Sequence, residues 1–267
     1  MSQLFGRVCR LSVGSLMWTD LRVAFEVQRS LAAKPNPGRI TIYGLNESSR
    51  AAVAIRGTQV RLFAGYTGNA ALVFGGEVRR CSHTKQDDGW HSELECSDGL
   101  SAWQKRVSAS WARGTPRRQV VEQACKALGL TLQPGQAHLV SGALEEPLAL
   151  YGLATHQADL LFRSLGLEWS VQSGELQLLR AGGVTTEQAV VLTPETGLVG
   201  VPEVEHAQSG RSAAVRVTSL LQPTITPGRL LQVESRTWTG RVRPSVVEYV
   251  GDTHGSDWYV RAEGRQV

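Results

Sequence analysis

The sequence contains few cysteines, and their spacing argues against the usual frameworks built from them. Cys9, Cys81, Cys96 and Cys125 lie far apart, and none belongs to a Cys-x-x-Cys pair. This spacing favours reduced thiols over disulfides or a zinc site. Cys81 and Cys96 could face each other across a hairpin, which the sequence alone leaves open.

Long apolar runs are also missing. No stretch approaches the roughly 20 apolar residues of a membrane-spanning helix, and the first ten residues lack the apolar centre of a signal peptide. We therefore expect a protein that folds in a cytoplasm and does not insert into a membrane. With 267 residues, 42% of them hydrophobic and 19% charged, the chain can form a globular core and more than one domain.

Motifs for catalysis and metal binding are absent or weak. The sequence has no Gly-x-x-x-x-Gly-Lys-[Ser/Thr] loop and no Gly-x-Ser-x-Gly elbow. Asp252, His254 and Asp257 could be taken for metal ligands, but they lie in a segment rich in turn-forming residues. His156 and Asp159 share a helix face and lack a third ligand. We expect no enzyme activity, no metal and no cofactor.

Basic residues exceed acidic ones by only four, and the excess is spread thinly along the chain. One basic cluster stands out because no acidic residue lies between Asp98 and Glu122. It contains Trp103, Lys105, Arg106, Trp111, Arg113, Arg117 and Arg118. Basic residues interleaved with aromatics can bind a nucleic-acid strand, and they are also enriched at protein interfaces.

The position of this cluster favours a protein interface. Arg117 and Arg118 fall near the start of a predicted helix, where positive charge is unfavourable. That mismatch suggests an acidic partner surface, for example in another subunit. We therefore interpret the cluster as a subunit contact in preference to a nucleic-acid site, and the alternative remains a packed linker.

Residues 1–102 show the two-residue alternation of β-strands. Apolar and polar residues alternate over 21–27, 39–43 and 60–64, with glycine-containing turns between them. Gly75 and Gly76 suggest a bulge that bends a strand.

Residues 103–183 have a different pattern, and residues 184–267 return to strands. Helical spacing predicts helices over 116–128 and 154–165, each followed by glycine, with Thr115 as the N-cap of the first. A hairpin over 168–179 turns at Ser173-Gly174, and its Trp169 and Leu176 are predicted core residues. Strands are predicted at 190–192, 213–220, 230–235, 242–250 and 258–262.

Several segments together resemble the tail hub proteins of contractile-tailed phages, the baseplate hub or late-control-D-like family. They are 36–46 (NPGRITIYGLN), 60–66, 73–78 and 97–99 in the first region and 195–198, 221–228 and 251–258 in the last. The resemblance implies a mainly β fold with a small α+β insert. Two tail-tube-like antiparallel β-barrel domains, 1–102 and 184–267, would be joined by a helix and hairpin module at 103–183.

The same resemblance implies a structural role in the virion. The chain would form a pseudo-sixfold homotrimeric ring between the tail tube, or a distal tube-initiator protein, and the central spike or tail tip. Baseplate wedge proteins are further partners, and DNA would pass through the channel without specific binding. Strands 36–45 and 229–237 would pair or pack across subunits. The alternatives are a nucleic-acid-binding barrel protein and a tail protein associated with cell-wall hydrolysis.

Overall fold

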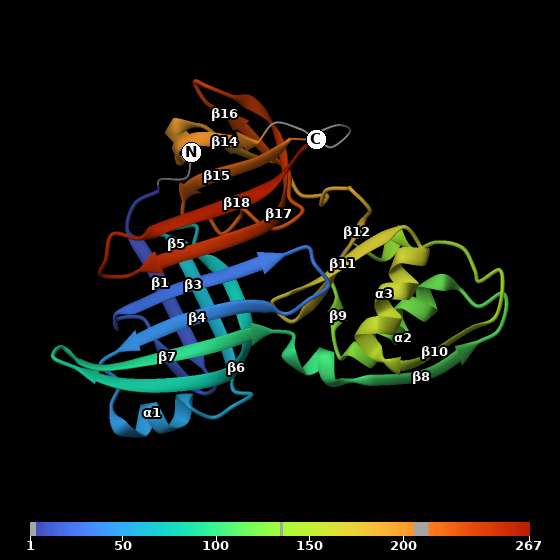
Figure 1. Cartoon of the computed structure of the whole chain (residues 1–267), viewed down its shortest axis with the longest axis horizontal. Helices are drawn as coiled ribbons and strands as arrows, with labels where there is room; N and C mark the ends of the chain where they lie inside the picture. Colours follow the sequence, from blue (N-terminus) through green and yellow to red (C-terminus); the bar gives the residue numbers. More distant parts are fainter. Residues whose placement is uncertain (1–3, 134–135, 206–212) are drawn as a thin grey trace. The chain divides into compact units, whose positions relative to one another are not determined.

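The computed structural model describes residues 4–133, 136–205 and 213–267 and divides the chain into two compact units. The first unit comprises residues 1–30, 36–98 and 185–267, and the second comprises 31–35 and 99–184. Most of the described chain is antiparallel β-structure with a small helical part (Figure 1), which confirms the predicted fold class. Each unit has its own hydrophobic core, so each is described by itself.

One large sheet forms the first unit. Its strands are β1 (Arg7–Val13), β2 (Leu16–Trp18), β3 (Val23–Ser30), β4 (Asn36–Tyr43), β5 (Gln59–Tyr66), β6 (Ala71–Gln86), β7 (Gly89–Asp98), β13 (Val190–Leu192), β14 (Leu198–Glu205), β15 (Ala214–Leu220), β16 (Leu231–Glu234), β17 (Thr239–Asp252) and β18 (Trp258–Gln266). The path runs β14-β15-β18-β17-β3-β4-β7-β6-β5-β1-β2, and β16 joins β13 to β17. Strands of the first and last sequence regions therefore share one sheet through the β17–β3 pair. The division into two barrel domains stays a prediction.

Alternation along the strands explains the core of this unit. Val23, Phe25 and Val27 of β3 point inward and are buried, as are Ile40 and Ile42 on the neighbouring β4. A short helix, α1 (Glu47–Val53), follows β4, and the Asn46 side chain caps it by accepting a hydrogen bond from the Ser49 N–H. The two-residue period thus gives both the strands and their buried face.

Two strands expected to lie at subunit contacts have no free edge. The segment 36–45 contains β4, which pairs with β3 on one side and β7 on the other. The segment 229–237 contains β16, which lies between β13 and β17. The expectation that these strands pair across subunits is therefore wrong, because alternation shows which face is buried but not which strands are neighbours. Packing of these strands across subunits stays a prediction. The sheet path ends instead at β14 and β2.

The second unit contains two helices and two small sheets. Its elements are η1 (Leu100–Gln104), β8 (Arg106–Trp111), α2 (Arg117–Leu128), β9 (Thr131–Leu132), η2 (Ala137–Leu139), β10 (Leu148–Leu153), α3 (Ala154–Ser164), β11 (Leu167–Gln172) and β12 (Glu175–Arg180). Both predicted helices are confirmed, and α2 ends at Gly129 with a φ of 68°. The predicted cap is displaced by one residue: Pro116 is the N-cap, and no side chain caps the helix there.

The hairpin of this unit is also confirmed. β11 and β12 pair from Leu167–Arg180 to Gln172–Glu175, and Ser173 at the turn has a φ of 57°. Trp169 and Leu176 are buried as predicted, and the Trp169 ring contacts Phe162 of α3. The β8–β10 sheet was not predicted from the sequence.

Candidate assembly surfaces

Of the two tryptophans of the predicted basic interface, Trp111 belongs to the core of the second unit and Trp103 packs against it. Trp111 is 7% exposed, and its indole N–H donates to Gln123 Oε1 at 3.1 Å. Trp103 is partly buried and stacks on Trp169, with ring centroids 6.0 Å apart. The prediction of Trp111 as an interface residue is therefore corrected, because its ring is packed away from solvent. The partly exposed Trp103 remains a candidate.

The three basic residues between these tryptophans and helix α2 have different surroundings. Lys105 Nζ packs against Gly129, which ends helix α2. The contact is so close that a Cβ at position 129 would lie only 1.8 Å from Nζ. A cation there is favourable for the helix dipole. Arg106 on β8 is exposed, and so is Arg113 in the loop before α2. Lys105 therefore has a role within the unit, while Arg106 and Arg113 remain available to a partner.

The arginines at the start of α2 find acidic partners in the same chain. Arg117 Nη2 lies 3.0 Å from Glu145 Oε1, and Arg118 Nε lies 2.8 Å from Glu122 Oε1 one turn further along the helix. These ion pairs offset the unfavourable charge at the helix start. Arg117 and Arg118 therefore do not require an acidic surface of another subunit.

An open groove in the second unit has a volume of about 690 Å³. Its walls include Trp103, Trp169 and the α3 residues His156, Asp159 and Arg163. The Asp159 carboxylate has two partners within the unit: it accepts a hydrogen bond from the Trp169 indole N–H at 3.3 Å and forms an ion pair with Arg163 at 2.9 Å. No group of three metal-binding side chains occurs in the described residues, so His156 and Asp159 have no third ligand there.

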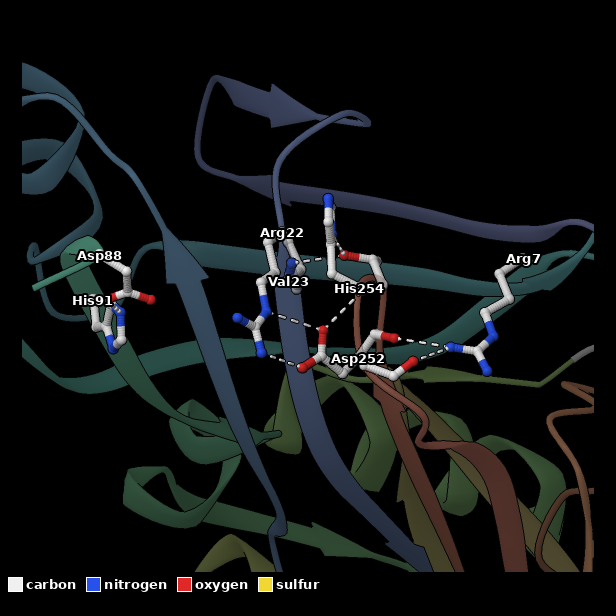
Figure 2. A network of polar contacts seen from close by, with 9 residues as sticks. Arg7, Arg22, Val23, Asp88, His91, Asp252 and His254 are labelled. Atoms are coloured by element: carbon white, nitrogen blue, oxygen red, sulfur yellow. Dashed lines mark hydrogen bonds and ion pairs between the residues drawn. The ribbon is translucent and has the colours of Figure 1, made fainter.

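The turn between β17 and β18 holds the first and last strands of the unit together (Figure 2). Arg22 forms an ion pair with Asp252 at 2.8 Å, and Arg7 donates to the carbonyls of Asp252, Gly255 and Ser256. The Asp252 carboxylate also accepts the His254 backbone N–H at 2.9 Å. Asp252 and His254 therefore order a turn, as their residue types predicted.

Hydrogen bonding in this network sets the acidity of Asp252. Partial burial opposes its ionisation, but the hydrogen bond from Arg22 and the backbone N–H groups of His254 and Gly255 outweigh that cost. The pKa of Asp252 is consequently held below its usual range. The ionised carboxylate links the end of β17 to Arg22, the residue just before β3.

A ladder of opposite charges crosses one face of the large sheet. Arg216 bridges Glu203 and Glu263 at 3.2 and 3.1 Å, linking β14, β15 and β18. Arg261 and Glu248 continue it from β18 to β17 at 3.1 Å. On the far side of β3, Arg39 pairs with Glu93 at 3.7 Å and Arg80 pairs with Glu95. Two adjoining hollows of about 340 and 430 Å³ lie on this face, and charges of both signs line them.

The burial of the cysteines makes them poor nucleophiles. All four are free thiols, and burial raises the pKa of Cys9 and of Cys96 to about 12. Burial is also the main cause that raises the pKa of Cys125 to about 11. A thiol is reactive as its thiolate, so these groups are inert near neutral pH. Across the described residues, the arrangement favours packing and interfaces over chemistry.

Comparison with known proteins decides what this architecture resembles. No family model matches the chain, and no curated protein matches it in sequence. Among solved structures, the 43 kDa tail protein of prophage MuSo2 from Shewanella oneidensis superposes with a TM-score of 0.70, covering 98% of each chain at 10% identity. The chain has the fold of a phage tail protein. The resemblance inferred from the sequence is thereby confirmed at the level of fold.

Two further structures extend this tail-protein fold. A tail protein from Neisseria meningitidis MC58 gives a TM-score of 0.68 at 8% identity, covering 98% of this chain and 97% of the other. The c3393 protein of Escherichia coli, a component of the type VI secretion system with structural similarity to the phage T4 tail proteins gp27 and gp5, gives 0.63 at 13% identity. That match covers 96% of this chain and 76% of the other. The tail-protein fold is therefore shared with a secretion machine.

Proposed function

We propose that this chain is a structural hub protein of a phage tail baseplate or of a related contractile machine. It forms a trimeric, pseudo-sixfold ring that joins the tail tube, or a tube-initiator protein, to the central spike or tail tip. The observation that carries the proposal is the superposition over 98% of both chains with a phage tail protein.

The charge ladder supports the passage of DNA without binding. Nucleic-acid affinity comes mainly from cations that are free to replace counterions at phosphates. On the ladder face, Arg216, Arg261 and Arg39 already have carboxylate partners. If this face borders the channel, DNA meets few uncompensated cations there. A gel-shift titration at low salt should accordingly show no retention of DNA, and tight binding would favour the alternative of a nucleic-acid-binding barrel.

Electron microscopy of an assembly reaction tests the proposal as a whole. The purified chain is mixed with the tail-tube and spike proteins of the same particle, and rings with threefold features attached to the tube end are expected. The same preparation is incubated with peptidoglycan, where the hydrolase alternative requires turnover. Rings absent under all mixing conditions, or clear release of cell-wall fragments by the chain alone, would overturn the structural assignment.

A further inference from the structure

The β2 end of the large sheet carries a cationic and apolar face. β1, β2 and β5 contain three arginines and no acidic residue. Their register places Met17, Ser12 and Arg61 in one row across the three strands, and Arg10 beside Phe63 in the next. We call these five residues the β1–β5 face. Met17 is 64% exposed, and Phe63 is partly buried.

The two arginines of the β1–β5 face lack a carboxylate partner among the described residues. Arg10 and Arg61 lie against the Phe63 ring, with their guanidinium carbons 5.4 and 5.7 Å from its centroid. The ring orders both cations without neutralising them. In the next strand, Gly75 lies opposite Arg61, and the nearby Glu77 accepts a hydrogen bond from Gln59. This differs from the ladder face, where the arginines are paired within the chain.

The opposite end of the same sheet has the complementary composition. β14 ends the sheet path and contains no basic residue. Val199, Val201, Glu203 and Glu205 alternate along it and are all exposed, with 44% of Val199 and 60% of Val201 accessible to solvent. We call these four residues the β14 edge. Glu203 shares Arg216 with Glu263, so the three residues together keep a net negative charge.

We propose that the β1–β5 face of one copy of this chain docks on the β14 edge of the next copy. Arg10 and Arg61 meet Glu203 and Glu205, while Met17 and Phe63 cover Val199 and Val201. Aromatic residues, Met and Arg are enriched at protein interfaces. The contact joins two different surfaces, so it is heterologous and propagates head to tail, as a ring requires. The inference rests on the proposed hub function and names the surfaces that build the ring.

Docking also covers the edge strand β14, whose backbone is otherwise open to other chains. A strand at the end of a sheet presents unpaired backbone groups to any other chain. β14 is only partly protected, by a bulge between Val199 and Glu203 and by Pro202. A neighbouring copy on the β14 edge shields its aliphatic half, so docking stabilises the assembled state relative to free chains.

Charge reversal followed by charge exchange tests the contact. In the full chain with its tube and spike partners, Arg10→Glu with Arg61→Glu should raise the concentration needed for ring formation by at least about tenfold, because like charges then face each other. Glu203→Arg with Glu205→Arg should do the same. The chain with all four changes should recover assembly, since each end is again opposite in charge. Arg241→Glu, an exposed residue on β17, is the matched control and should assemble normally.

Cysteine trapping provides a second measurement. Met17→Cys combined with Val201→Cys should give dimer and trimer bands under oxidation. The wild-type chain, whose Cys9 and Cys81 are partly exposed, is the control and should give no such bands. Rings that persist in the Arg10→Glu, Arg61→Glu chain, or rings of the Met17→Cys, Val201→Cys chain that give no trapped bands, would overturn this inference while leaving the hub function standing. A wild-type chain that stays monomeric with both partners present would overturn both.

Discussion

Two tryptophan side chains of the second unit are buried in its core and make hydrogen bonds there. Trp169 shows this most clearly, because it combines burial, stacking on Trp103 and an indole hydrogen bond to Asp159. The indole N–H of Trp111 likewise donates a hydrogen bond to Gln123. Aromatic residues beside arginines in a sequence can therefore indicate a core as well as an interface.

Replacing Trp169 by alanine should destabilise the second unit by about 3–5 kcal/mol, because a large buried ring is lost. Trp169→Phe should cost less, since it keeps much of the ring volume and loses mainly the hydrogen bond to Asp159. Guanidinium unfolding followed by near-ultraviolet circular dichroism measures both. Equal stability of the alanine variant and the wild type would mean that the ring is exposed in solution.

The Asp252 network gives a prediction about acid stability. The pKa of Asp252 is lower in the folded state, so its contribution is present above the unfolded pKa and is lost as pH falls through the folded pKa. Asp252→Asn should therefore lower stability at pH 7 by about 1.5–3 kcal/mol, the range for hydrogen bonds to charged groups. The difference from wild type should shrink below about pH 4. Asp88→Asn, a more exposed partner of His91, is the control with little effect.

At the scale of elements, the sequence predicted the helices and strands that show a clear local periodicity. Helices α2 and α3 carry apolar residues at helical spacing and glycine after their ends, so both were found. β8 was missed because Arg106-Val-Ser-Ala-Ser-Trp alternates small residues with weak strand preference. The Arg118–Glu122 pair was visible in the i, i+4 spacing, whereas Glu145 lies 28 residues from Arg117 and only folding brings them together.

The two separate cores make the second unit removable. Every residue of the first core lies in the first unit, and every residue of the second core lies between Ala102 and Leu178. Replacing 99–184 by a flexible linker should leave a folded, β-rich first unit that assembles poorly. Circular dichroism and sedimentation would measure these effects. An insoluble product from a chain whose full-length form is soluble under the same conditions would show that the first unit depends on the second.

For the whole molecule, the proposed hub function makes a prediction about the number of copies in the assembly. β-structure occurs at both ends of the chain, and the strands from the two ends form two neighbouring parts of one sheet that meet at the β17–β3 pair. If the two predicted barrel domains occupy equivalent ring positions, three chains supply six positions. A trimer then matches a sixfold tube on one side and a threefold spike on the other, and a heterologous contact closes only at a fixed rotation.

We therefore expect a discrete trimer, or a monomer that becomes a trimer when the spike or tube protein binds. Light scattering after size exclusion gives the mass directly, as three times 29.0 kDa for the trimer. The β1–β5 face and the β14 edge lie on one chain, so dimers would leave one of each exposed, and these remaining ends should drive further addition until closure. A stable dimer with and without partners, or a hexamer with one position per chain, would contradict the pseudo-sixfold arrangement and require an isologous interface instead.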